Sequence, residues 1–265
     1  MSDSVFGPWP TIFAFDLGRY LVVASLAFAV FWVWKWNAFA HRRIQPRRPS
    51  NARLLHEIKY SLVTGVIFAT VGLVTFHLAG AGYLQRYEHV DDYGWPYWFV
   101  SIAIAIVLHD TYFYWTHRAM HTRWLYKHVH KVHHMSTNPS PWAAYSFSPL
   151  EALVEAGIAP VVFALVPMHG VAMFVFLGYM IVMNVLGHLG IELYPSWFAT
   201  SRWTRSLTTA THHNLHHRDF HANYALYFTW WDRLMGTMHP RYEAEFARAA
   251  GGAAPVSTGS PETRV

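Results

Sequence analysis

Five apolar segments constrain the fold of this 265-residue chain more than any other feature. Three of them are close to the roughly 20 residues that a membrane-spanning helix needs. The other two are shorter, and Met168-His169-Gly170 separates them, which predicts a helical hairpin. The five segments are 18–36, 61–84, 95–115, 156–168 and 171–187. We therefore expect an all-α protein whose helices cross a lipid bilayer about four or five times.

The composition agrees with a membrane protein. Only 13% of the residues are charged, about half the share in a typical soluble domain. Aromatic residues make up 17% of the chain, which excludes a disordered protein. The sequence contains no cysteine but 19 histidines, so imidazole is the abundant metal-ligating group. These features predict a multi-pass helical bundle that binds metal.

The basic residues predict the orientation, because cytoplasmic loops collect Lys and Arg. Residues 37–59 contain six of them, whereas the loop after the second segment contains only Arg86. Five crossings would place 37–59, 116–149 and 190–265 on the cytoplasmic side. This distribution accounts for the net charge of +5, and no nucleic-acid partner is expected. We expect one domain, 1–248, with a catalytic core at about 95–240 and a disordered tail, 249–265.

Three histidine boxes lie in the regions expected at the cytoplasmic face. Two boxes read H-x-x-H-H and one reads H-x-x-x-H. Residues i, i+3 and i+4 share one face of a helix, so each box is expected to aim its imidazoles at one point. Neutral imidazole suits iron, copper, nickel and zinc, and eight ligands are about right for two ions. The boxes are His117 and His121, then His130, His133 and His134, then His213, His216 and His217.

Further polar residues lie near the boxes. His188 and Asn184 are four residues apart at the end of an apolar segment, where polar groups are costly without a function. Asp110 lies on the same helical stripe as the first box, where a carboxylate could accept the free N–H of a ligating imidazole. His109 and His212 either hydrogen-bond to the centre or have no role in it.

Other metal chemistries lack their motifs. The chain has no H-E-x-x-H zinc-protease motif and no glycine-rich phosphate loop. Ferritin-type di-iron bundles use inward-facing glutamates and Glu-x-x-His pairs, whereas the boxes here offer only imidazoles.

The boxes and their surroundings resemble the fatty acid hydroxylase/sterol desaturase superfamily, whose members are integral-membrane non-haem di-iron enzymes. The resemblance covers roughly 95–240. The approach to the first box, 109–118, resembles that family, as do Asn223-Tyr224 and 231–237 after the third box. The stretch NPSPWAAYSFSPLEA, 138–152, is similar to sterol C-5 desaturases, although Ser140 stands where these more often have Thr.

The resemblance implies two iron ions and places their ligands on nine histidines. Asn184 stands where some relatives have another histidine. A fused haem-binding domain is missing, which implies a separate electron donor, either a ferredoxin, a cytochrome or a reductase. The implied ligands are His117, His121, His130, His133, His134, His188, His213, His216 and His217.

The resemblance implies an enzyme that uses O2 and two electrons to desaturate or hydroxylate a lipid. A sterol or sterol-like substrate is preferred, and the alternative is a hydroxylase of fatty acyl, sphingoid or carotenoid chains. A metal transporter or sensor is an alternative of another class. A transporter should place its polar residues near the middle of the bilayer, whereas these histidines gather at one face.

Overall fold

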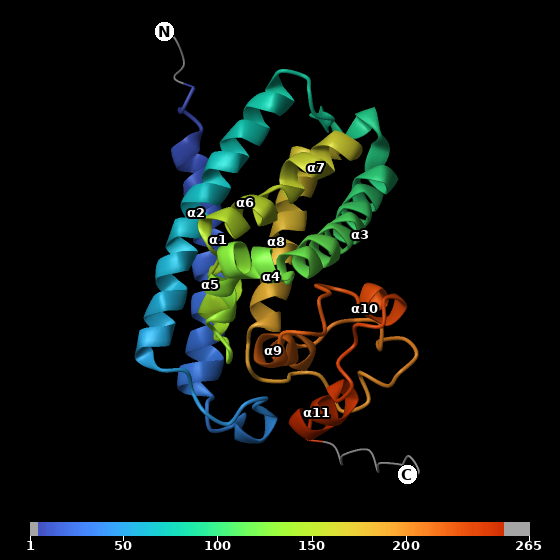
Figure 1. The fold of residues 1–265 in the computed structure, drawn as a ribbon. Coiled ribbons are helices and arrows are strands. Elements are labelled where there is room, and N and C mark those ends of the chain that lie inside the picture. The colour runs from blue at the N-terminus through green and yellow to red at the C-terminus, as the bar shows by residue number, and fades with distance from the viewer. Residues whose placement is uncertain (1–4, 252–265) are drawn as a thin grey trace.

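Four long helices form the core of the computed structural model, which describes residues 5–251. They are α1 (Trp9–Ala27), which continues as the π-helical η1 (Phe28–Trp34), α2 (Asn51–Gly80), α3 (Gly94–Met120) and α8 (Gly170–Gly187). In Figure 1, α1 and α2 lie together on one side of α8, and α3 lies on the other side. The fold is therefore the predicted helical bundle.

The outer faces of these helices are apolar. Val22 on α1, Val66 on α2 and Phe99 on α3 are all exposed. All four helices are long and apolar enough to cross a membrane. Exposed apolar patches of this extent indicate a lipid environment, so the protein is an integral, multi-pass membrane protein.

The apolar segment 156–168 forms one short helix, α7 (Ile158–Leu165), before the chain reaches β2. A second short helix, α6 (Pro149–Ala156), precedes it, and the two helices meet at Gly157. A Cβ atom on Gly157 would lie 2.8 Å from the Tyr112 hydroxyl. The bundle thus has four spanning helices and a fifth passage made of two helices of 8 residues each.

This fifth passage leads from the histidines to the opposite end of the bundle. At its start, the Ser148 hydroxyl donates to the carbonyl of Val129, next to His130. At its far end, β2 (Met168–His169) pairs in parallel with β1 (Arg86–Tyr87), which lies between α2 and the short η3 (Val90–Asp92).

Short helices follow α3 and carry the second box. They are α4 (Arg123–Leu125), η4 (Tyr126–His130), α5 (Lys131–His134) and η5 (Pro141–Tyr145). The hydroxyls of Tyr20 on α1 and Ser61 on α2 both donate to the carbonyl of Trp142 in η5. These bonds fix the segment after the second box against the membrane helices.

A cap of three helices closes one end of the bundle: α9 (Ala210–Asp219), α10 (Trp230–Leu234) and α11 (Tyr242–Ala249). Phe198, Leu215 and Phe246 are buried in its core. Arg42, in η2 (Ala40–Arg42) after α1, donates to the carbonyls of Glu192, Tyr194 and Ala250. The loop after α1 is therefore bonded to the cap.

The sequence predicts a disordered tail from residue 249, but the structure places residues 249 and 250 in the folded cap. Ala249 ends α11, and both it and Ala250 are buried, because α11 packs its apolar side against α9 and the rest of the cap. Residues 252–265 of the expected tail lie outside the described residues.

Candidate metal centre

All nine predicted histidines converge in two neighbouring groups, each able to hold a metal ion. Within each group, the candidate ligand atoms lie within 4.8 Å of one another. The first group has five members, His117, His121, His130, His134 and His216, and the second has four, His133, His188, His213 and His217.

The structure divides the second and third boxes between the two groups. His130 and His134 belong to the first group, but His133 between them belongs to the second. In the third box, His216 joins the first group, and His213 and His217 join the second. The expectation that each box aims at one point is therefore wrong for the second and third boxes, whereas His117 and His121 of the first box do lie in one group. Consecutive helical residues point about 100° apart, so one box can serve two ions.

The Nε2 atoms face one another at close range. In the first group, Nε2 of His117 lies 3.1 Å from that of His130, and His134 lies 3.0 Å from His216. In the second group, His188 and His213 are 3.0 Å apart. Two nitrogens, each about 2.1 Å from one ion and at a right angle, are about 3.0 Å apart. The spacing therefore fits ligands around a shared ion.

The other ring nitrogen of several ligands is bonded to a backbone carbonyl. Nδ1 of His117, His216 and His188 lies 2.9, 2.7 and 2.8 Å from the carbonyl oxygens of residues 224, 222 and 184. A carbonyl only accepts, so the proton is on Nδ1 and Nε2 keeps its lone pair. Facing lone pairs repel unless a cation lies between them, and this donor set fits a metal ion.

Glu151 is a residue that sequence reasoning missed. Its Oε1 lies 2.6 Å from Nδ1 of His130, and both side chains are buried. This carboxylate–imidazole pair is the usual support of a metal-bound histidine. Ser148 caps α6 and accepts a hydrogen bond from the Glu151 N–H. The sequence signal that could have identified Glu151 is a helix start at Ser148-Pro149 followed by an acidic residue.

Burial keeps the imidazoles neutral. It lowers the pKa of His133, His134, His213 and His217 well below the ordinary value, and neighbouring imidazoles lower it further. Burial also lowers the pKa of His188 to about 4. Neutral imidazole is the form that binds metal.

Two residues predicted near the centre have other partners. Asp110 Oδ1 accepts the N–H groups of Tyr227 and Phe228 instead of an imidazole. The expectation for Asp110 is therefore wrong, because its carboxylate accepts from the backbone that follows the third box. His109 is hydrogen-bonded to the Tyr227 hydroxyl. Both residues attach α3 to the cap.

Asn184 and His212, the other two residues predicted near the centre, support the ligands indirectly. The backbone carbonyl of Asn184 bonds to His188, while the Asn184 side chain donates to Ala144. His212 is bonded to Asp232, which also accepts from the N–H of Tyr224. Asp232 thereby ties α9 to the strand-like segment that bonds to His117.

The start of α9 is held by two side chains. The Thr209 hydroxyl accepts from the His212 N–H, and the buried Glu192 carboxylate accepts from both N–H and hydroxyl of Thr211. Acceptors and negative charge at a helix N-terminus are stabilising. Glu192, which the sequence analysis did not identify, thus helps to position the third box.

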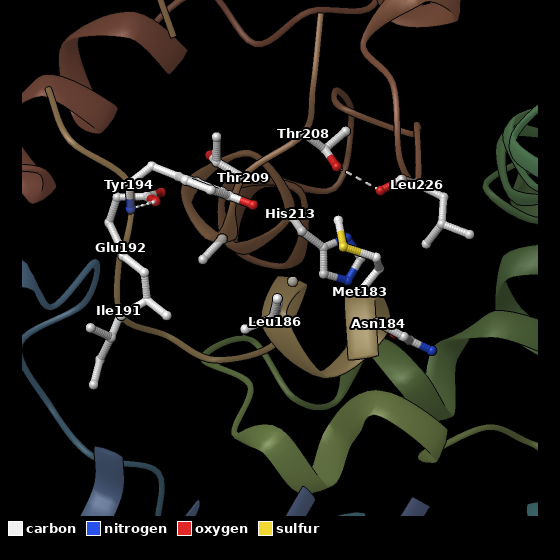
Figure 2. A pocket seen from close by; sticks show the side chains of 13 residues that line it. Met183, Asn184, Leu186, Ile191, Glu192, Tyr194, Thr208, Thr209, His213 and Leu226 are labelled. Atoms are coloured by element: carbon white, nitrogen blue, oxygen red, sulfur yellow. Dashed lines mark hydrogen bonds between the residues drawn. The ribbon is translucent and has the colours of Figure 1, made fainter. Parts of the chain in front are cut away.

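A small cavity borders the second group. It has a volume of about 120 Å³ and lies between the end of α8 and the cap. Figure 2 shows the Met183 side chain beside the His213 ring, with Leu226 on one side of them and Glu192 and Tyr194 on the other. The cavity is mostly apolar, so it offers an apolar group a place next to these imidazoles.

Comparison with known proteins agrees with this geometry. The fatty acid hydroxylase family model matches residues 102–237, which include all nine histidines. The chain belongs to the fatty acid hydroxylase family. No solved structure shows a significant similarity to it.

The relatives within this family include sterol desaturases. A delta(7)-sterol 5(6)-desaturase of Aspergillus fumigatus is 31% identical, over 82% of this chain and 71% of that protein. Another, from Gibberella zeae, is 32% identical, over 82% of this chain and 64% of that protein. Lathosterol oxidase of Rattus norvegicus is 30% identical, over 85% of this chain and 73% of that protein. The resemblance to sterol C-5 desaturases is thus confirmed.

Proposed function

We propose that this protein is an O2-dependent di-iron oxidoreductase that desaturates or hydroxylates a lipid, with a sterol or sterol-like substrate preferred. The observation that carries the proposal is the convergence of nine imidazoles in two adjacent groups. We assign the five histidines of the first group to one iron ion and the four of the second group to the other. When bound, the iron pair supplies the reaction with O2 that breaks an unactivated C–H bond.

The residues of the chain prepare this chemistry. Backbone carbonyls and Glu151 fix the ligand rings through Nδ1, so that Nε2 is free for metal. Burial excludes water from the ligands, which protects a reactive oxidant from side reactions. The small cavity beside His213 provides apolar space next to the second group.

We place the centre on the cytoplasmic side. The basic loop after α1 contacts the cap through Arg42, whereas the connection between α2 and α3 carries only Arg86. The positive-inside rule then orients the cap toward the cytoplasm. Electrons would come from a separate donor protein on that side.

Two other functions are less well supported. A hydroxylase of fatty acyl, sphingoid or carotenoid chains would use the same centre but another substrate. A metal transporter or sensor should have ligands along its membrane helices, whereas His117 lies in the last turn of α3 and His188 just after α8.

The test is incubation of the iron-loaded protein, an electron donor and candidate lipids with ¹⁸O-labelled O2. A product that gains ¹⁸O indicates hydroxylation, and one that loses two hydrogens without label indicates desaturation. His216→Ala and His133→Ala should abolish both outcomes, whereas the exposed His128→Ala should not. A single tightly held zinc ion in an active preparation would refute the di-iron assignment.

A further inference from the structure

A second, larger cavity lies between helices of the bundle and opens toward their outer, apolar surface, since Phe15, Phe76 and Phe174 in its wall are exposed. It has a volume of about 370 Å³ and is lined by α1, α2, α6, α7 and α8. Its walls come from the first half of α1, the second half of α2 and the first half of α8, so it lies in the part of the bundle away from the cap. Small-molecule sites have volumes of about 300–1,000 Å³, which is the range of this cavity.

The cavity is mostly apolar, and besides Thr11 and Thr75 its polar lining consists of four ionisable residues. Three of these have partners: Asp16 and Arg19 form an ion pair at 2.8 Å, and Arg86 is paired with Glu88. The fourth, Glu155, has no hydrogen-bond or ion-pair partner within residues 5–251, although its exposure is only 8%.

An unpartnered buried carboxyl costs free energy. The Glu155 carboxyl faces an apolar space, so the group that completes its hydrogen bonding must arrive with an apolar body. A lipid with one hydroxyl meets both requirements, since the hydroxyl donates to a carboxyl oxygen and the hydrocarbon fills the cavity.

Glu155 also connects the cavity to the metal centre. It lies one helical turn from Glu151, which is bonded to His130. A second connection runs from Phe68 in the cavity wall to Phe147, whose ring packs against His133 at 5.1 Å between centroids. The end of the cavity at Glu155 is therefore its end nearest the histidines.

We propose that this cavity binds the lipid substrate, with Glu155 accepting a hydrogen bond from its single hydroxyl. The assignment rests on the function proposed above, and it adds where the substrate binds and how it is oriented. The hydroxyl end lies toward the metal centre and the hydrocarbon tail points away from the cap. The attacked C–H bond is then a few bonds from the hydroxyl.

Binding of radiolabelled cholesterol and its 3-methyl ether to the purified protein in nanodiscs tests the site without requiring turnover. Ala159 lines the cavity, so Ala159→Phe should weaken cholesterol binding at least about tenfold. Ala164→Phe, on the exposed side of the same helix, should not. Equal binding by both variants would overturn the site. Photocrosslinking of a diazirine cholesterol provides a second measurement, and labelling outside the cavity walls would also overturn it.

The role of Glu155 has its own test. The wild type should prefer cholesterol to the methyl ether by up to about tenfold, which corresponds to the loss of one buried hydrogen bond. Glu155→Leu should remove this preference, and Glu155→Gln should keep part of it. An unchanged preference in Glu155→Leu would refute the role of Glu155.

Failure of this site and failure of the proposed function give different results. If the protein oxidises a sterol but Ala159→Phe is fully active, the site is wrong and the function stands. If cholesterol binds as described but no lipid is oxidised, the function is wrong and the site stands.

Discussion

The pair formed by Glu151 and His130 supports a quantitative prediction about metal affinity. A hydrogen bond to a charged group contributes about 1.5–3 kcal/mol, and this one is 2.6 Å long between buried side chains. Each 1.4 kcal/mol is a factor of about ten, so its loss should weaken iron binding by about 10- to 100-fold. Partners of metal-bound histidines have effects of this size.

Two substitutions of Glu151 should give losses of iron affinity near the lower and the upper limit of this range. Glu151→Gln keeps a neutral acceptor for His130 but brings an amide N–H₂ to the place of Oε2, which has no partner within the described residues. We expect a loss near the lower limit. Glu151→Ala removes the acceptor altogether, and we expect a loss near the upper limit.

The measurement is a competition titration of the iron-loaded protein with a ferrous chelator. Because His130 belongs only to the first group, about half the iron should leave at a lower chelator concentration than in the wild type. Glu243→Gln on the exposed face of α11 is the control and should behave as the wild type. Release of all the iron in one unchanged step from Glu151→Ala would refute the reasoning.

Three further predictions concern stability. Thr209→Ala removes the N-cap of α9 and should reduce the free energy of unfolding by about 1 kcal/mol, measured by thermal or denaturant unfolding; no change would contradict the role of this cap. Removal of iron by a chelator should lower Tm, because an ion that binds only the folded state stabilises it; an unchanged Tm would show that the ions do not stabilise the fold. The metal-free protein should lose stability as pH falls, because burial lowers the pKa of His188 from 6.5 to about 4 and the unfolded chain then binds more protons. This loss should develop between pH 6.5 and 4, and a stability that is constant or rises over this range would contradict the assignment of neutral imidazoles.

The sequence was sufficient for the parts that depend on local pattern. Apolar length predicted the spanning helices, and the spacing of the three boxes predicted eight members of the centre, to which the family resemblance added His188. The short helix α6 before Gly157 was not predicted, since an isolated glycine does not by itself distinguish a break from a continuous helix. Local sequence patterns also could not predict contacts between distant segments. Glu151 reaches His130 across 21 positions, and Asp110 meets Tyr227 across 117.

The division of the second and third boxes between the two groups has a consequence for biogenesis. Each group needs at least one ligand from the third box, so neither is complete until that box has been synthesised. By then, all four spanning helices have already been made. Metal loading is therefore a late step, and a ribosome-bound chain that stops before His213 should lack the complete ligand set of either group.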